Sequence, residues 1–404
     1  MLITFGLLMM LSHARARRRF ERLCSTAPQM LANVRDLLGF TPEQLTRLCC
    51  HNTVDRYLRT LPSEFLQEAL TLVVRGLIRS KFLDDFRFFG SFRLAIDGTE
   101  IFRYKRRHCP HCLTAEHADG RIDYFHQIVT AKIITAGGLS FPVAFEMIDN
   151  SEPGNFDKQD CETKAGLRLM KRVRELFPRT PFHLLGDALY ACEPILQLCT
   201  DYNWSFSLTF KKGRTPKLWA EAQRQFELQS SQCRTGRCVV NGKTVSRVYA
   251  WIHNLDHKGS TCHVVRLEET KDKKTTTFVY LTDLRPDRDN VIDLVNKGGR
   301  QRQKLETSHD IQKHHGYELD HDYGSQGHAL ANYIQLIQIA HLINQIICRT
   351  NLLAKLAADR HCPCPAVLYE SVRDFIAELA ISLYRNAFSP AATRQDFNLS
   401  WDCA

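Results

Sequence analysis

The sequence lacks an apolar run long enough to cross a membrane as a helix, which takes about 20 residues. Its apolar beginning, residues 1–11, is too short, no charge precedes it, and no small-residue cleavage site follows it. These absences argue against a membrane anchor and against a secretion signal. We interpret the segment as a helix end and expect no membrane partner.

The chain also lacks an even set of cysteines that could form a complete disulfide framework. Its 15 cysteines are an odd number and are scattered over 404 residues. Reduced cysteines of this kind fit the cytoplasm better than a secreted location. We therefore expect a cytoplasmic protein.

What the chain does have is the composition of a large globular protein. Hydrophobic residues make up 44% and charged residues 24%, enough for a sizeable core split into two or three units. The formal net charge of +10 favours a polyanionic partner such as nucleic acid. Many basic proteins bind nothing acidic, so the charge alone does not decide the partner.

The first 90 residues are predicted to be helical. Residues 41–50 begin with an N-cap, a proline at the first helical position and a capping-box glutamine, so a helix is expected through Cys50. Residues 63–82 form another helix whose apolar side chains, Phe65 among them, share one face. Packing and recognition of a DNA end are both open as roles for this region.

From residue 92 the pattern changes to strands and helices. The order strand, strand, strand, helix, strand, helix, strand is expected over residues 92–96, 126–135, 139–148, 158–176, 182–186, 193–202 and 205–210. Gly137 and Gly138 mark a hairpin, so the first three strands are antiparallel, whereas crossovers join the later ones. This is the order of a ribonuclease H-like core, an α/β fold with a mixed sheet.

Acidic residues follow two strands that are neighbours in such a sheet. Asp97 ends the first strand and Asp187 ends the strand after the first helix, so both carboxylates could meet at one edge. An Asp in this position is more often a turn or N-cap residue when taken singly. Together, oxygen ligands of this kind suit Mg²⁺ or Mn²⁺. Two ions about 4 Å apart could activate a water or a 3′-hydroxyl and steady a leaving oxygen.

A third acid lies in a charged stretch over residues 298–313. If this stretch is helical, Arg302, Glu306 and Lys313 fall at i, i+4 and i+11, nearly on one face. A surface helix with ordinary ion pairs would explain the stripe by itself. With Asp97 and Asp187, however, Glu306 becomes the third ligand of a metal site flanked by phosphate-binding cations.

Three stretches resemble the motif blocks of DDE transposases of bacterial insertion sequences: residues 94–99 (LAIDGT), 185–190 (LGDALY) and 302–313 (R-x3-E-x6-K). The last resembles the Y-R-E-K signature of that family. The tyrosine position falls on Gly299, so a tyrosine contact to DNA is not carried over. The resemblance covers roughly residues 90 to 350.

The resemblance implies a prokaryotic transposase, associated with the nucleoid when bound to DNA. It would bind double-stranded DNA at the terminal inverted repeats, free a 3′-hydroxyl and join it to target DNA, without a covalent protein intermediate. Asp97, Asp187 and Glu306 would hold the catalytic ions, two Mg²⁺ or Mn²⁺. The candidates for phosphate binding are Arg302, Lys313, Arg300, Lys211 and Lys212. Paired ends imply a homodimer.

Two alternatives stay open. One is a ribonuclease H-like nuclease or resolvase that cuts without strand transfer. The other is a catalytically inactive DNA-binding relative that merely inherited the fold. Joined products, rather than nicks alone, would separate a transposase from both.

The expected organisation places a β-rich insertion within the catalytic core. Asn241 and Gly242 mark one hairpin in it, and the charged residues 268–274 mark another. Similar transposases carry a β insertion at this point. The predicted units are a helical region 1–90, core residues 91–212, the insertion 213–275, further core residues 276–350 with the Glu306 helix, and a helical tail 351–404.

A second metal site is suggested by Cys109 and Cys112, a C-x2-C pair of the kind that opens a structural zinc site. A second pair at such spacing is missing, and His126 and Cys161 are the candidates for completing tetrahedral coordination. Free buried cysteines are the alternative. The basic residues 105–107 beside the pair make this region a candidate DNA contact.

Overall fold

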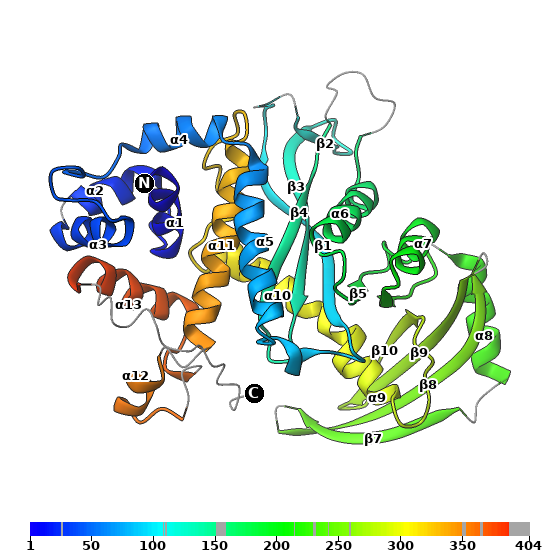
Figure 1. The fold of residues 1–404 in the computed structure, drawn as a ribbon. Coiled ribbons are helices and arrows are strands. Elements are labelled where there is room, and N and C mark those ends of the chain that lie inside the picture. The colour runs from blue at the N-terminus through cyan, green and yellow to red at the C-terminus, as the bar shows by residue number, and fades with distance from the viewer. Residues whose placement is uncertain are drawn as a thin grey trace.

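The computed structural model describes residues 1–25, 27–107, 109, 111–150, 159–213, 215–228, 232–240, 242–257, 260–349, 353–363 and 367–387. It is a mixed α/β protein in which helices pack around one ten-stranded sheet (Figure 1). The predicted α/β class with a mixed sheet is confirmed.

The sheet joins strands from most of the chain. They are β1 (Phe92–Tyr104), β2 (Leu113–Glu116), β3 (Ile122–Ile134), β4 (Ser140–Ile148), β5 (Phe182–Gly186), β6 (Ser205–Thr209), β7 (Cys233–Val240), β8 (Lys243–His257), β9 (Ser260–Lys271) and β10 (Lys274–Thr282). Their order is β2-β3-β1-β5-β6-β10-β9-β8-β7, with β4 paired to β3. β3 is antiparallel to β1 and β4, whereas β1, β5 and β6 run parallel.

The longer helices are α1 (Leu2–Leu11), α2 (Arg17–Ser25), α3 (Pro28–Leu38), α4 (His51–Thr60), α5 (Ser63–Arg79), α6 (Glu162–Leu176), α7 (Glu193–Tyr202), α8 (Pro216–Leu228), α10 (Gln303–His314), α11 (Ala329–Arg349), α12 (Ala354–Asp359) and α13 (Val372–Arg385). Short helical turns cover Asp84–Phe86 and α9 (Val291–Asp293). Leu94 and Ile96 of β1 pack in one core with α6 and α7, whereas Ala95 contacts Leu305 of α10. The alternation along β1 therefore separates an α6 face from an α10 face.

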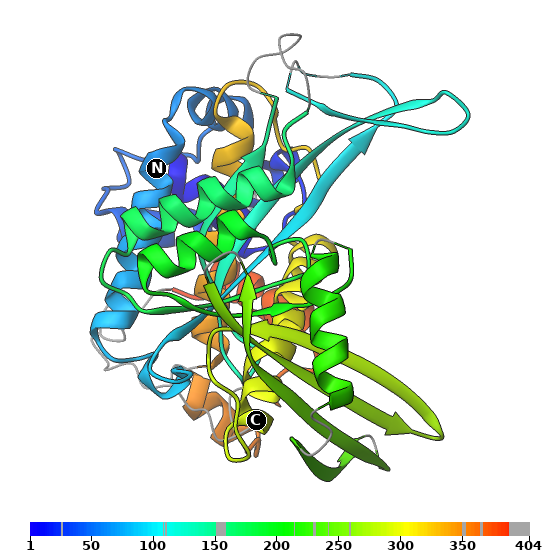
Figure 2. The same cartoon turned by 90° about the vertical axis from the view of Figure 1, so that its right-hand side faces the viewer.

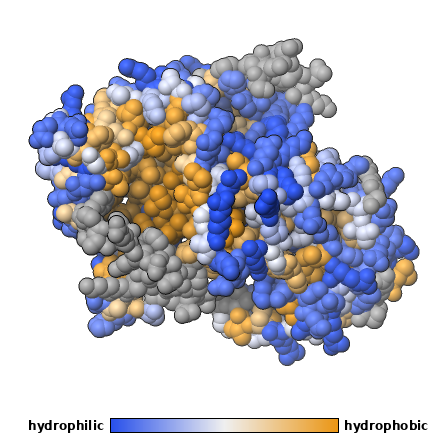
Figure 3. Space-filling model, in the orientation of Figure 1, coloured by the Kyte–Doolittle hydropathy of each residue, from blue (hydrophilic) through white to orange (hydrophobic). Residues whose placement is uncertain are grey.

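The apolar N-terminus forms a buried helix rather than an exposed one. Phe5 and Met9 of α1 are almost fully buried, and Gly6 lies so close to α11 that a Cβ there would be 2.7 Å from Leu336 Cδ1. In Figure 3 the apolar residues gather on the side of these N-terminal helices. Among the described residues, no helix combines the length and the apolar character needed to pass through a lipid bilayer.

The helix expected over residues 41–50 is wrong. The capping-box contacts do form, because Gln44 N donates to Thr41 Oγ1 (3.3 Å) and Thr41 N donates to Gln44 Oε1 (2.9 Å). The chain then leaves the helical path: Arg35 Nε donates to the Leu45 carbonyl at 2.7 Å, an oxygen that a continuing helix would use internally. The next helix, α4, begins only at His51. Within α5, the predicted apolar face is narrower than expected, since Phe65 is exposed.

The predicted strand 182–186 matches β5, and the predicted helix 193–202 matches α7. The first strand does not end at Asp97, because β1 continues to Tyr104 through its pairing with β3. Only its pairing with β5 stops before Asp97.

The β-rich insertion extends the same sheet instead of forming a separate one. β10 pairs with β6 of the parallel part, and β9, β8 and β7 continue outward from it. β7 and β8 form the predicted hairpin, of which Asn241 lies outside the described residues. The sequence did not predict α8, which precedes the insertion strands and packs against β8. In Figure 2, this part of the sheet and the ends of β1–β3 both project to the same side.

Candidate active site

Asp97 and Asp187 lie beside each other where the parallel part of the sheet ends. β1 and β5 pair in register as far as Ala95 with Leu185. Continuing this register by two residues brings Asp187 beside Asp97, on strands about 4.8 Å apart. Asp97 shares the face of Ala95, which contacts Leu305 of α10. The two aspartates therefore open toward the helix that carries Glu306.

Helix α10 is fixed against the sheet by one apolar contact and several buried polar ones. Leu305, directly before Glu306, is fully buried against β1 and β5. From β3, Lys132 Nζ donates to Ser308 Oγ and to Gln312 Oε1, both at 2.8 Å. Burial lowers the pKa of Lys132 to about 7. These contacts set the position of α10, which carries Glu306.

The predicted single helix over residues 298–313 is interrupted. A π-helical turn, Leu294–Gly298, and a 3-10 turn, Gly299–Arg302, precede α10. Arg302 and Glu306 nevertheless keep the expected i,i+4 contact. Arg302, in the 3-10 turn before α10, also contacts Asp97 of β1.

Arg302 connects Glu306 to Asp97. Its guanidinium lies 2.6 Å from Glu306 Oε1 and 3.3 Å from Asp97 Oδ2. Two groups of three possible metal ligands within 4.8 Å of one another occur in the described part of the chain, and neither contains these acids. The guanidinium takes the place between the two carboxylates, so any ion shared by Asp97 and Glu306 must displace it.

The pKa of Asp97 is strongly perturbed. Burial raises the pKa of Asp97 to about 7, and Arg302 opposes this shift. The charges of Glu162, Asp187 and Glu306 add to the increase. Asp187 and Glu306 therefore lie near enough to Asp97 to influence its pKa. Such a site favours either protonation or a bound cation.

Glu162 is a fourth acid of this site, and sequence reasoning missed it. It is the first residue of α6; its Oε1 accepts from Gly98 N (3.1 Å) and from the Tyr190 hydroxyl (3.0 Å). Its Oε2 accepts from Gln127 Nε2 at 3.1 Å. Burial, followed by the charge of Asp187, raises the pKa of Glu162. The only sequence signal for Glu162 was an acid near the start of the predicted helix. A carboxylate is favourable at the start of any helix, so this signal does not point to a site.

Gly299, at the position of the signature tyrosine, lies in a sterically restricted place. Gly299 lies directly against the ring of Tyr280 in β10, and a Cβ at Gly299 would overlap that ring. Tyr280 is nearly fully buried. The aromatic ring beside this turn therefore comes from β10, and a side chain at Gly299 has no room.

Arg300, a predicted phosphate contact, forms an ion pair with a residue of the insertion. Its Nη1 lies 2.8 Å from Glu269 Oε2 of β9, and its guanidinium lies 5.2 Å from the centre of the Phe278 ring. Arg247 of β8 contacts the same carboxylate oxygen at 2.7 Å. Arg300 thus ties the turn before α10 to the insertion strands.

The remaining predicted phosphate contacts are Lys211, Lys212 and Lys313. Lys211 and Lys212 are exposed directly after β6. Lys313 is half-buried at the end of α10, and both Lys313 and Glu100 of β1 line a hollow there. Burial lowers the pKa of Lys313, against the opposing charges of Asp320 and Glu100.

Three of the four predicted zinc ligands come together away from the carboxylates. Cys109 and Cys112, in the link between β1 and β2, lie beside His126 of β3. Cys161 is not part of this group; it is exposed at the N-cap of α6. No disulfide bond joins the cysteines of the described residues.

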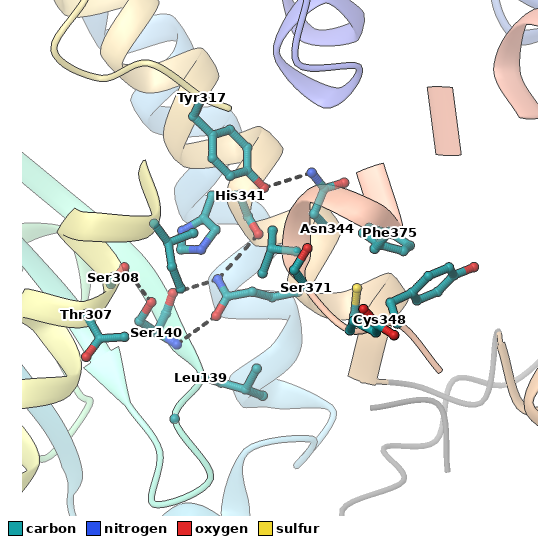
Figure 4. Close-up of a pocket in the computed structure, with 16 residues that line it drawn as sticks. Leu139, Ser140, Thr307, Ser308, Tyr317, His341, Asn344, Cys348, Ser371 and Phe375 are labelled. Carbon is teal, nitrogen blue, oxygen red and sulfur yellow. Dashed lines mark hydrogen bonds between the residues drawn. The ribbon is translucent and has the colours of Figure 1, made fainter. Parts of the chain in front are cut away.

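A cavity of about 260 Å³ lies on the other side of α10, between α11 and α13 (Figure 4). Ser140 Oγ donates to Ser308 Oγ at 2.7 Å in its wall, and Asn344 Nδ2 donates to the Tyr317 hydroxyl at 2.8 Å. None of Asp97, Asp187 and Glu306 lines it. The cavity is therefore separate from the acidic site.

No protein-family model matches the chain, and no curated protein matches it.

Proposed function

We propose that this protein is a DDE-type DNA transposase, a metal-dependent enzyme that cuts DNA at the ends of its element and joins the freed 3′-hydroxyl to target DNA. The proposal rests on the strand register that places Asp97 beside Asp187 and on Arg302, which contacts both Asp97 and Glu306. The motif resemblance of residues 94–99, 185–190 and 302–313 supports the same class.

The strand order supports a ribonuclease H-like core for this enzyme. β4, β3 and β1 are antiparallel neighbours, and β5 and β6 follow in parallel, with α6 and α7 as crossovers. The insertion strands β7–β10 lie between this core and α10 in the chain, the position at which similar transposases carry a β insertion.

The donor set fits two Mg²⁺ or Mn²⁺ ions. Asp97, Asp187 and Glu306 offer only carboxylate oxygens, the hard ligands that these ions prefer. The raised pKa of Asp97 reflects burial together with negative charge that a bound cation would offset. Bound ions would supply a polarised phosphate and an activated water or 3′-hydroxyl.

The chain's own side chains would bind and orient the DNA. Arg302 now neutralises Asp97 and Glu306; released from them, its guanidinium can bind a phosphate through two parallel hydrogen bonds. Exposed Lys211 and Lys212 would contact the DNA backbone, as would exposed cations of the insertion such as Lys273. Double-stranded element ends and target DNA are the proposed partners, with a homodimer holding two ends.

Incubation with DNA carrying the flanks of the protein's own gene tests this proposal. We expect nicks at the element boundary and joined products with Mg²⁺, and neither in a chelator. Nicks without any joined product would favour a nuclease or resolvase. DNA binding without metal-dependent cleavage would identify an inactive relative and refute the enzyme assignment.

A further inference from the structure

We propose that Cys109, Cys112 and His126 bind one Zn²⁺ ion, which fixes the basic link between β1 and β2 for contact with DNA phosphates. This site is distinct from the carboxylate site in position and in ligand chemistry. Its metal content can be measured without DNA and without enzyme activity, so it stands or falls independently of the transposase assignment.

Two of the three distances between the ligand atoms match a tetrahedral site, and the third, between Cys109 and His126, is shorter. Cys109 Sγ lies 3.5 Å from Cys112 Sγ and 3.1 Å from His126 Nε2, and Cys112 Sγ lies 3.7 Å from that nitrogen. With Zn–S bonds of about 2.3 Å and Zn–N bonds of about 2.0 Å, neighbouring tetrahedral ligands lie about 3.5 to 3.8 Å apart. A disulfide between the cysteines would not require the imidazole to approach both sulfurs.

The fold brings these residues together through the pairing of long strands. β3 pairs with β1 at His126 and Phe102, and with β2 from Leu113 and Phe125 onward. Cys112 directly precedes Leu113, so the end of the link must return to His126. Cys112 and His126 are almost fully buried, which shields their metal-binding atoms from competing water.

The ligand set selects Zn²⁺ over the ions proposed for the acidic site. Two thiolates and an imidazole are soft to intermediate donors, whereas Mg²⁺ takes oxygen ligands. On binding, each thiol releases its proton to solvent, and two thiolates with Zn²⁺ form a neutral unit. That unit can remain inside the hairpin without an unpaired buried charge. His111 lies near the pair, but its Nδ1 is 3.1 Å from Asp149 Oδ1.

The residues around the proposed zinc site indicate which part of the chain the ion would hold in place. The described residues between Tyr104 and Leu113 belong to no strand, and this link carries Lys105, Arg106 and Arg107. The Arg107 guanidinium lies 5.5 Å from the centre of the Tyr124 ring in β3. A metal bond at Cys109 anchors the link two residues after these cations. Anchored in this way, the cations present a fixed basic surface on the projecting ends of β1–β3 (Figure 2).

The test uses the full-length chain purified from zinc-supplemented cells. We expect about one zinc per chain by elemental analysis in the wild type and in Cys233→Ser, a control at an exposed cysteine of β7. Cys109→Ser, Cys112→Ser and His126→Asn should each lose most of it. Zinc retained at wild-type content in these variants would refute the site.

A second measurement does not depend on how the variants fold. Wild-type protein stripped by a chelator and titrated with Co²⁺ should develop thiolate-to-cobalt absorption that saturates at one ion per chain and disappears when Zn²⁺ is added. Absence of this absorption, or a thiol count two short because Cys109 and Cys112 are oxidised to each other, would overturn the proposal. Chelation should also weaken DNA binding in the absence of Mg²⁺, and unchanged binding would refute the proposed role of the ion.

Discussion

The carboxylate of Glu162 fills the space that a side chain at Gly98 would need. Its Oε1 accepts a hydrogen bond from Gly98 N at 3.1 Å, and a Cβ at Gly98 would overlap the carboxylate. Gly98 directly follows Asp97, so this close approach sets the fourth acid beside the first. The requirement for glycine at this position is therefore steric and local to the acidic site.

Gly98→Ala should displace Glu162 and strain the start of α6. We expect a loss of about 1 to 3 kcal/mol in the free energy of unfolding, together with reduced Mg²⁺-dependent cleavage. Denaturant unfolding measures the first effect. Gly76→Ala in α5 is the matched control: nothing lies within 4 Å of its Cβ, and the change should be neutral or stabilising. Equal destabilisation of both variants would contradict the steric explanation.

Asp97→Asn should alter how stability depends on pH. The pKa of Asp97 is raised from 3.8 to about 7, so the folded state holds this proton more tightly than the unfolded state. Its stabilising contribution is present below the ordinary pKa and is lost as the pH rises through about 7. The melting temperature of Asp97→Asn minus that of the wild type, without metal, should therefore become more positive from acidic to alkaline pH. A difference that stays constant across this range would show that Asp97 is not perturbed.

Lys132→Met tests how α10 is held in place. The change removes the donor to Ser308 and Gln312, and two buried oxygens lose a partner. We expect destabilisation by about 1 to 3 kcal/mol and slower cleavage, because Glu306 is carried by the same helix. Lys171→Met, on the exposed surface of α6, should change stability by less than about 0.5 kcal/mol. Wild-type stability in Lys132→Met would argue against the role of this contact.

Gly299→Ala should be destabilising because of Tyr280 rather than because of the backbone. The φ angle of Gly299 is −51°, which alanine adopts readily, but its Cβ would meet the Tyr280 ring. In a double-mutant cycle, Tyr280→Ala should remove most of the cost of Gly299→Ala. Additive effects of the two changes would mean that the ring is not the obstacle.

Sequence patterns predicted the parts of the fold that depend on local signals. The continuous apolar run of β5 and the start of α7 were located correctly, and the topology then brought Asp97 near Asp187. The helix predicted over residues 41–50 was wrong for a non-local reason, because Arg35 donates a hydrogen bond to the Leu45 carbonyl that a helix would use internally.

The site residues that were missed depend on contacts between distant segments. Glu162 is bound by Gly98, Gln127 and Tyr190, which come from three other parts of the chain. The pairing of Arg300 with Glu269 likewise depends on how the insertion strands continue the sheet. No spacing along the sequence contains this information.

Replacing Asp187 by cysteine tests whether Asp97, Asp187 and Glu306 hold catalytic metal ions. A thiolate is a poor ligand for Mg²⁺ but a better one for Mn²⁺. Cleavage of DNA carrying the element ends should fall by at least about a hundredfold in Mg²⁺, since even residues that only orient ligands cost 10–100-fold, and should recover in part in Mn²⁺. Asp187→Asn should stay inactive in both ions while still binding DNA. Cleavage by either variant at the wild-type rate in Mg²⁺ would contradict the account.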